Sequence, residues 1–274
     1  MSNKTDIRTL DLSELTQTVL EWGEKSFRAK QVYEWLWKKN VRSFEEMSNL
    51  SKTFRERLEG EFSILPIVVA EEQQSADGTI KSAFETFDKK TVEGVLIPTD
   101  KRLTACISSQ VGCSLACAFC ATGRLKRLRN LTSAEIVDQV VNINQQAMSS
   151  FNKPLSNIVF MGMGEPLLNY REVLAAIDKI TSEDGLGMSP KRITVSTAGV
   201  SKMIRKLGDD EVKFNLALSL HAADDQKRNK IMAINEQNNL EELASSLNYF
   251  YSKTKNIITF EYIIFKDFND GISD

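Results

Sequence analysis

Three cysteines within eight residues constrain this 274-residue chain more than any other feature of its sequence. Cys113, Cys117 and Cys120 have the spacing C-x3-C-x2-C, so one short loop supplies three thiolates. A [4Fe–4S] cluster usually has four cysteine ligands, and three thiolates satisfy three of its irons. The spacing therefore predicts a [4Fe–4S] cluster on this loop, with the fourth iron free to bind another molecule.

Two other uses of clustered cysteines have to be weighed. A structural zinc site needs four ligands, and Cys106 would have to be the fourth, because the single histidine, His221, lies far along the chain. Disulfides are less favoured because the polar start from Met1 to Lys4 shows no signal peptide. In such a chain, clustered cysteines are typical of metal or catalytic sites. The sequence favours the cluster and leaves zinc as the alternative.

The composition is that of an ordinary soluble globular protein, with 42% hydrophobic and 26% charged residues. No apolar run approaches the ~20 residues of a membrane span. The net charge of −2 gives no general attraction to nucleic acids. We expect a cytoplasmic monomer without a membrane segment.

The local charge around the cysteine loop is different. The stretch from Lys101 to Ala134 contains no acid and six basic residues, which are Lys101, Arg102, Arg124, Lys126, Arg127 and Arg129. Basic side chains around a site indicate an anionic substrate, and a solvated basic loop is the alternative.

Residues 1–65 are predicted to form a separate helical domain. Apolar residues recur at helical spacing over 12–23, 27–39 and 51–62, and Ser51 is a suitable N-cap. The region is locally basic. This charge can indicate contact with RNA, and the alternative is a solvated helical face without a function in binding.

Residues 66–100 form a short β region, and residues 101–274 alternate between strands and helices. Strands are predicted at 103–108, 158–161, 193–196, 214–220 and 257–265, with helices between them. This alternation predicts an α/β fold with a parallel sheet, whose functional residues collect at the carboxyl ends of the strands. The chain stops nine residues after the fifth strand, so we expect a partial barrel and a fragment of a longer protein.

Polar residues follow several of these strands. Gly164 and Glu165 lie in the run Met161–Pro166 after the second strand, where glycine lets a ligand approach the backbone. Ser196 and Ser219 close the third and fourth strands and can bond a ligand, although capping of the following helices is the ordinary role of serine there. A lone histidine such as His221 is more often structural than catalytic.

The cysteine spacing resembles the signature of the radical S-adenosylmethionine enzymes, and the ordered set of motifs resembles the RlmN/Cfr family of RNA methyltransferases within them. The resemblance covers nearly the whole chain. It rests on Gly23–Gln31, Val92-Glu93, Cys106–Cys113, Cys120–Gly123, Met161–Asn169 and Ser219–His221. It implies a partial (β/α)6 TIM-like barrel of the radical S-adenosylmethionine type, preceded by a small helical N-terminal domain and a short β region.

The resemblance also implies an activity, with its cofactors and partners. RlmN enzymes methylate carbon 2 of an adenine in 23S rRNA and in tRNA next to the anticodon, and Cfr enzymes methylate carbon 8. The cofactors are a [4Fe–4S] cluster and two molecules of S-adenosylmethionine per turnover, with an electron donor such as flavodoxin or ferredoxin. One S-adenosylmethionine methylates a cysteine near the C-terminus, and the second generates the radical that joins this methyl carbon to the adenine.

Residue roles follow from the same resemblance. Cys113, Cys117 and Cys120 hold the cluster, Cys106 resolves the protein–RNA adduct, and Glu93 accepts a proton. The S-adenosylmethionine ligands are Gly164, Glu165, Ser196, Ser219, Leu220 and His221. The alternatives are a buried, inert Cys106 and a solvent-facing Glu93.

One departure affects the expected activity. The methyl-carrying cysteine is missing, because all four cysteines lie between residues 106 and 120. We therefore expect these 274 residues alone not to complete the methyl transfer. Three other functions stay open, namely a Cfr-like methyltransferase, a radical enzyme acting on a small molecule, and a non-catalytic, zinc-stabilised RNA-binding module.

Overall fold

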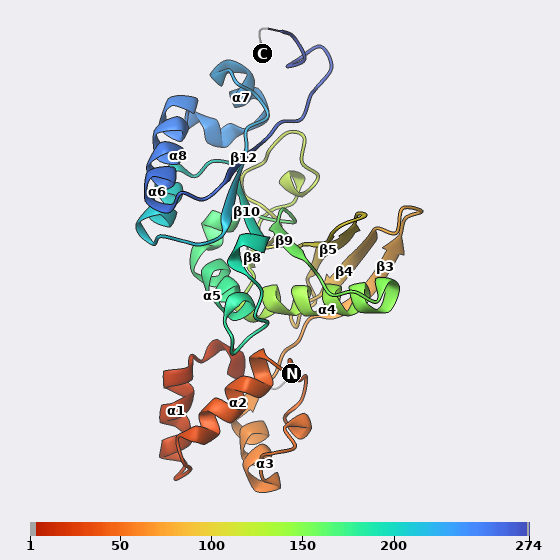
Figure 1. The fold of residues 1–274 in the computed structure, drawn as a ribbon, viewed down its shortest axis with the longest axis vertical. Coiled ribbons are helices and arrows are strands. Elements are labelled where there is room, and N and C mark those ends of the chain that lie inside the picture. Colours follow the sequence, from red (N-terminus) through yellow and green to blue (C-terminus); the bar gives the residue numbers. More distant parts are fainter. Residues whose placement is uncertain (1–3, 273) are drawn as a thin grey trace.

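The computed structural model describes residues 4–272 and 274, in which a helical unit precedes one large sheet (Figure 1). The helical unit contains α1 (Leu12–Glu21), α2 (Phe27–Trp37) and α3 (Lys52–Glu61), closed by a pairing of β1 (Thr5–Asp6) with β2 (Phe62–Ser63). Asp11 and Glu14 form a reciprocal capping box ahead of α1, and Ser51 caps α3. The predicted helices are therefore present, and their buried apolar residues belong to the same core as those of the sheet domain. They include Leu15, Val19, Val32, Leu36, Phe54 and Leu58.

Eight strands form one mixed sheet in the order β12-β11-β10-β9-β6-β5-β4-β3. The antiparallel part contains β3 (Val68–Gln74), β4 (Ile80–Glu85) and β5 (Thr91–Pro98), and β5 also pairs antiparallel with β6. The parallel part contains β6 (Leu103–Cys106), β9 (Asn157–Phe160), β10 (Ile193–Thr197), β11 (Asn215–Ser219) and β12 (Ile258–Glu261). The β region and the parallel strands thus share one continuous sheet.

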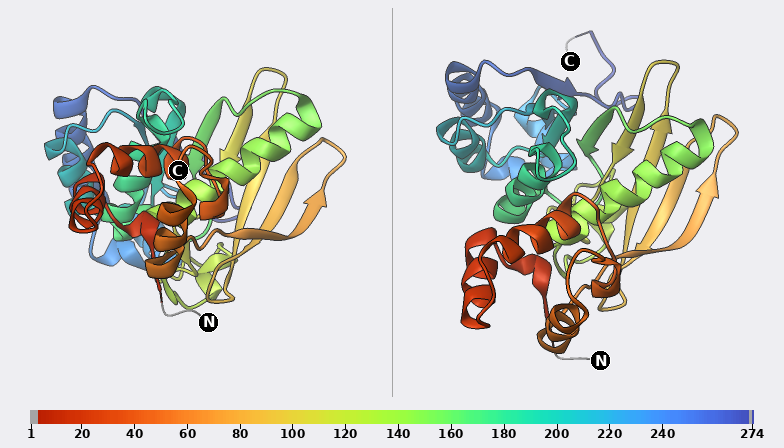
Figure 2. Two further views of the ribbon diagram at one scale, coloured as in Figure 1. Left: turned by 90° about the horizontal axis from the view of Figure 1, so that it is seen from below. Right: turned by 60° about the horizontal axis from the view of Figure 1, so that its bottom comes forward.

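Helices cover one face of this sheet, as expected for parallel strands joined by crossover helices. They are α4 (Ser133–Phe151), α5 (Tyr170–Thr181), α6 (Ser201–Asp209), α7 (Asp225–Ile231) and α8 (Leu240–Thr254). Helix α4 packs against β5 and β6, and α6 packs against α8 (Figure 2). The covered face is apolar and buried, and its side chains include Ala105, Ile158, Phe160, Val195, Leu216 and Leu218.

The other face of the parallel strands is more polar. The strand register places Cys106 beside Val159, and Ser219 beside Glu261. Because side chains alternate between faces, Ser196 lies on this same face. The predicted α/β class with a partial barrel is therefore confirmed, and one face of the sheet carries polar groups at the strand ends.

The fifth parallel strand ends earlier than the sequence suggests. The apolar run predicts a strand over 257–265, but β12 ends at Glu261. The reason is the buried Asn269, whose amide donates to the carbonyl oxygens of His221 (2.7 Å) and Ile263 (2.8 Å) and accepts from the Phe265 amide (2.6 Å). These bonds fold the segment after Glu261 back on itself. In the part of the chain that the structure describes, no helix is long and apolar enough to cross a membrane.

A buried ion pair docks the helical unit on the sheet domain. The Arg8 guanidinium donates to both carboxylate oxygens of Asp138 on α4, at 2.8 and 2.9 Å, and to Asp6. Only 5% and 14% of the Arg8 and Asp138 side chains are exposed. The Asp138 carboxylate also accepts from the Ile67 amide at 3.1 Å. Asp138 therefore holds the chain both before and after the helical unit.

Removing Arg8 should destabilise the protein strongly. We expect Arg8→Met to lower the free energy of unfolding by about 3–5 kcal/mol, because it leaves a buried carboxylate without its partner. Urea denaturation followed by circular dichroism measures this change. Lys52→Met is the matched control, since its pair with Glu56 is 83% and 61% exposed and should contribute less than about 1 kcal/mol. Equal losses in the two variants would contradict the role of Arg8.

Candidate active site

Backbone bonds beyond the strand ends hold two loops together. After β6, the amides of Ser109 and Gln110 donate to the Met163 carbonyl at 2.9 and 3.2 Å. In return, Gly162 N donates to the Ile107 carbonyl at 3.0 Å, and Met163 N donates to the Ser108 hydroxyl at 2.8 Å. These contacts extend the pairing of β6 with β9. The cysteine loop and the loop around Glu165 therefore start from one shared support.

Gly162 and Gly164, in the loop around Glu165, allow the two loops to lie this close together. A Cβ added at Gly162 would lie 2.7 Å from the Ser108 hydroxyl and 2.8 Å from the Ile107 backbone. Gly164 has φ +99°, and its Cβ would lie 2.5 Å from the Gln110 side chain. The sequence interpretation assigned these glycines to close approach of a ligand. In the structure, the neighbouring chain segment makes a close approach, and both glycines also line the cavity described below. Their role toward a ligand stays a prediction.

The cysteine loop is a series of tight turns closed by backbone bonds. Cys120 N donates to Cys117 O at 3.1 Å, and Gly123 N donates to Cys120 O at 3.0 Å. Gly112 allows the close return of the chain, because a Cβ there would lie 2.2 Å from the Lys126 carbonyl. Ala118 N donates to the Ile231 carbonyl at 2.9 Å, which attaches the loop to the end of α7. The thiols are thus presented by a well-supported loop.

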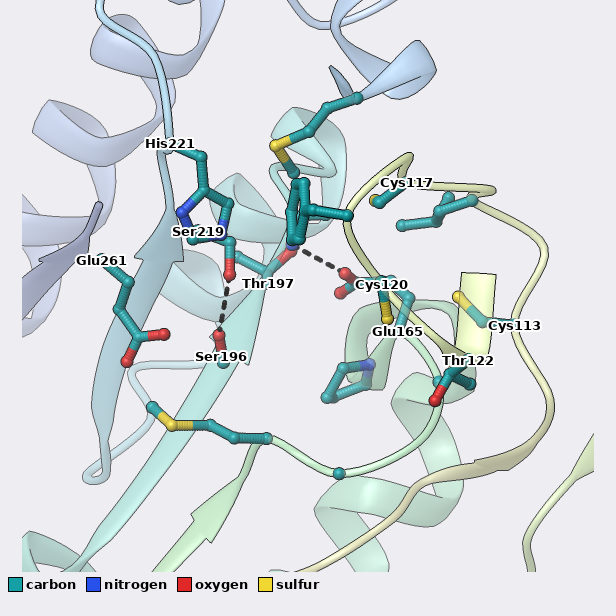
Figure 3. Close-up of a pocket in the computed structure, with 18 of the residues that line it drawn as sticks. Cys113, Cys117, Cys120, Thr122, Glu165, Ser196, Thr197, Ser219, His221 and Glu261 are labelled. Carbon is teal, nitrogen blue, oxygen red and sulfur yellow. Dashed lines mark hydrogen bonds between the residues drawn. The ribbon is translucent and has the colours of Figure 1, made fainter. Parts of the chain in front are cut away.

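The three thiols line one cavity of about 410 Å³, together with residues from the ends of β9, β10, β11 and β12 (Figure 3). Burial raises the pKa of Cys117 to about 11 and also raises that of Cys113, and repulsion between neighbouring thiolates adds to both shifts. Three acidic groups that repel one another need protons or metal ions to neutralise them. The cavity therefore has the donor chemistry of a metal site.

The donors in the cavity suit a cluster. Cys113, Cys117 and Cys120 are three thiols on one loop that line the same cavity. In a [4Fe–4S] cluster each thiolate binds a different iron. The chemistry of the residues present therefore fits the cluster that the spacing predicts.

Glu165 is buried under the cavity and organises its wall. Its carboxylate accepts from the Ala198 amide at 2.8 Å, shown in Figure 3, and from the Leu167 amide at 3.0 Å. Burial raises the pKa of this carboxyl, and the bonds from Ala198 and Leu167 oppose that shift. The side chain thereby joins the loop after β9 to the end of β10.

Ser196 and Ser219 face each other in the cavity, with their hydroxyl oxygens 3.4 Å apart (Figure 3). The capping alternative for both serines is wrong. The N-cap of α6 is Val200, which makes no side-chain cap, and the N-cap of α7 is Asp224. Both hydroxyls therefore stay available to a ligand.

His221 has a structural bond and a place in the cavity. It lies in the left-handed region with φ +56°, its Nδ1 accepts from the Ile263 amide at 3.2 Å, and its ring packs edge-on against Phe119 at 4.7 Å. Burial and the nearby charge of Arg228 lower its pKa to about 4. The ring is therefore neutral at pH 7.

Three residues predicted for the site do not line the cavity. The side chain of Leu220 is partly buried against the apolar core, and its amide donates to the Glu261 carbonyl at 3.0 Å. Cys106 ends β6 half-buried, and burial raises the pKa of its thiol to about 11. Glu93 is exposed on β5 and forms an ion pair with Lys81 at 2.8 Å. The register of Val95 with Cys106 nevertheless places Glu93 and Cys106 on the same face of the sheet.

Two charged residues at the site were missed by sequence reasoning. Glu261 points into the cavity from the end of β12 (Figure 3). It was missed because the predicted strand ran past it to Phe265. Arg228 lies fully buried in α7, next to the cavity wall. In the sequence, Arg228 lies in the polar run Asp224–Lys230, which is typical of a solvent-exposed helix. The sequence around it therefore does not predict a buried side chain.

The basic residues near the loop divide into two groups. Arg124, Lys126 and Arg127 are exposed. Arg129 is instead bound internally, with bidentate bonds to Asp88 (2.7 and 2.9 Å) and to Glu135 (2.7 and 2.8 Å). Its assignment to a free basic patch is wrong, because two carboxylates occupy its guanidinium.

Comparison with known families gives two matches. The model described as "Ribosomal RNA large subunit methyltransferase N-terminal domain" matches residues 5–64, and the model described as "Radical SAM superfamily" matches residues 107–272. The first match covers the helical unit, and the second covers the cysteine loop and the parallel strands from β9 to β12.

Individual proteins are similar over nearly the whole chain. A "Probable dual-specificity RNA methyltransferase RlmN" from Cytophaga hutchinsonii is 59% identical over 99% of this chain and 74% of its own length. A protein of the same name from Christiangramia forsetii is 57% identical over 99% of this chain and 77% of its own length. The crystal structure of a radical SAM methyltransferase from Sphaerobacter thermophilus superposes with a TM-score of 0.91 at 35% identity, over 98% of this chain and 79% of that one.

Proposed function

This chain belongs to the RlmN family of radical S-adenosylmethionine RNA methyltransferases, and on that premise we propose that it methylates carbon 2 of adenine in 23S rRNA and in tRNA next to the anticodon. The observation that carries the proposal is the cavity itself. It joins the three thiols of the cysteine loop to Glu165 and to the hydroxyls at the ends of β10 and β11. The family uses a [4Fe–4S] cluster and S-adenosylmethionine, and this cavity has the donors for both.

The proposed roles of the residues follow from their positions. When bound, the cluster and S-adenosylmethionine would supply the radical that activates the methyl carbon of a methylated cysteine, and this carbon can add to the electron-poor carbon 2 of adenine. Cys113, Cys117 and Cys120 bind three irons. Five of the residues proposed to hold S-adenosylmethionine line the cavity, namely Gly164, Glu165, Ser196, Ser219 and His221. The sixth, Leu220, stands between Ser219 and His221 in the chain.

Cys106 and Glu93 are proposed to act on the adduct rather than on the cofactors. Their position outside the cavity but on the same face of the sheet supports this division. The thiol of Cys106 is protonated at neutral pH, because burial raises its pKa to about 11. A proton acceptor is therefore needed near it, and Glu93 is our proposal for that group.

We propose that RNA is held by the helical unit and by the exposed side chains of Arg124, Lys126 and Arg127 beside the cavity. These side chains can contact phosphates because they project into solvent near the cysteine loop. We further propose a monomer that acts in the cytoplasm, where its substrates are, and receives electrons from a flavodoxin or ferredoxin.

Cluster binding should depend on the loop cysteines and not on Cys106. After anaerobic reconstitution with iron and sulfide, we expect Cys113→Ala to lose the visible iron–sulfur absorbance, because one iron then has no thiolate. Cys106→Ala is the matched control and should keep that absorbance at the wild-type level. Bound zinc with no iron in the wild-type protein would instead support the zinc-stabilised module.

RNA binding should depend on the exposed basic residues and not on Arg129. Replacing Arg124, Lys126 and Arg127 by glutamine should weaken binding to an anticodon stem-loop and reduce the slope of log K against log salt by about one unit for each lost phosphate contact. Arg129→Gln should leave the slope unchanged, because Asp88 and Glu135 already occupy that side chain. A triple variant with the wild-type slope would contradict the proposed RNA contact.

The reaction itself is tested by mass spectrometry of RNA. Expression of this sequence, extended to the full length of its RlmN relatives, in cells that lack 2-methyladenine should produce 2-methyladenosine in 23S rRNA and tRNA. The 274 residues alone should bind the cluster but form no methylated adenine, because no residue after Cys120 is a cysteine that can carry the methyl group. Formation of 8-methyladenosine would overturn the assignment to carbon 2, and methylation by the 274 residues alone would overturn the two-cysteine mechanism.

A further inference from the structure

Arg228 is a fully buried arginine whose hydrogen bonds all go to neutral groups. Its side chain is 0% exposed. The guanidinium donates to the carbonyl oxygens of Ala198 (2.7 Å), Ser219 (3.1 Å) and Leu220 (3.0 Å), and to the amide oxygen of Asn235 (2.6 Å). Burying a charge in this way costs several kcal/mol unless something offsets it.

No carboxylate forms an ion pair with Arg228 among the residues that the structure describes. Asp225 is linked to Arg228 only through Asn235. The side-chain amide of Asn235 accepts from Arg228 through its oxygen and donates to Asp225 through its nitrogen, at 2.8 Å. Burial lowers the pKa of Arg228, but only to about 10. The guanidinium therefore keeps its positive charge at neutral pH.

The charge lies directly behind the cavity. Arg228 bonds the Ala198 carbonyl, while the amide of the same residue donates to Glu165 inside the cavity wall. Helix α7, which carries Arg228, receives the bond from Ala118 in the cysteine loop through its last residue, Ile231. The next residue, Met232, lines the cavity. One short helix thus connects the buried cation to the thiols.

A buried positive charge favours whichever state of its neighbour is more negative. Reduction of a [4Fe–4S] cluster adds one electron to a group already bound to three thiolates, so the reduced state is more negative by one unit. The low dielectric of the interior strengthens this attraction, because no water screens it. Net charge around a cluster is one of the factors that set its reduction potential.

We propose that Arg228 is a positioning residue whose buried charge raises the reduction potential of the cluster on Cys113, Cys117 and Cys120, and so eases transfer of the first electron. The inference rests on the proposed cluster site. It also gives a reason for the otherwise costly burial. The same side chain fixes the ends of β10 and β11 through its bonds to Ala198, Ser219 and Leu220.

The reduction potential of the reconstituted protein tests this directly. The measurement is an anaerobic redox titration of the 274-residue chain, with the reduced cluster followed by electron paramagnetic resonance. We expect Arg228→Met to shift the midpoint potential to more negative values by at least about 59 mV. For one electron, this shift is a tenfold fall in the ratio of reduced to oxidised cluster at a given potential. Arg228→Lys keeps the charge and should restore most of the wild-type value.

A second variant tests the charge without touching Arg228. Asp225→Asn keeps the oxygen that accepts from Asn235 and from Leu240 N but removes the negative charge. We expect its midpoint to move the opposite way, to more positive values. A role in folding alone would not give shifts of opposite sign in the two variants.

The outcomes separate this inference from the proposed function. A wild-type chain that takes up no iron–sulfur cluster would overturn both. A cluster whose midpoint is the same in the wild type, in Arg228→Met and in Asp225→Asn would overturn only the role of Arg228. If Arg228→Met does not fold, an unchanged midpoint in Asp225→Asn still decides against it.

Discussion

The pairing of residues 107–110 with residues 162–163 holds both halves of the candidate site. It extends the parallel contact of β6 with β9 past the ends of both strands, using the amides of Ser109 and Gln110 and the carbonyl of Met163. The cysteine loop follows residues 107–110 in the chain, and Glu165 follows residues 162–163. Parallel strands present their carboxyl ends at one edge of a sheet, and this extra pairing makes that edge a fixed frame.

The sequence predicted the fold well because periodic apolar patterns and caps are local signals. The strands from Leu103 onward and the helices between them occur where the alternation placed them. The predicted end of the fifth parallel strand was wrong, because the buried amide of Asn269 bonds the nearby Ile263 carbonyl and the distant His221 carbonyl, and so overrides an apolar run. Such long-range polar contacts leave no periodic trace in the chain.

The candidate site was predictable where strand ends could be located, and not elsewhere. Ser196, Ser219 and the cysteine loop reach one cavity because the topology brings their strand ends together. The close contacts of Gly162 and Gly164 with residues 107–110 depend on tertiary structure, so the sequence could not show them. The partners of Arg129 lie in another hairpin and in α4, and charge alone therefore misassigned this residue to a free basic patch. The catalytic and ligand roles stay predictions.

The Asp138 carboxylate accepts hydrogen bonds from Arg8, before α1, and from the Ile67 amide, after α3. The two ends of the helical unit are therefore attached to α4 at the same residue. Arg42 and Tyr33 make further contacts from the helical unit, to Asn142 and Lys179. Side chains of the helical unit that make none of these contacts can therefore change without moving its attachment to α4 or the geometry at the strand ends.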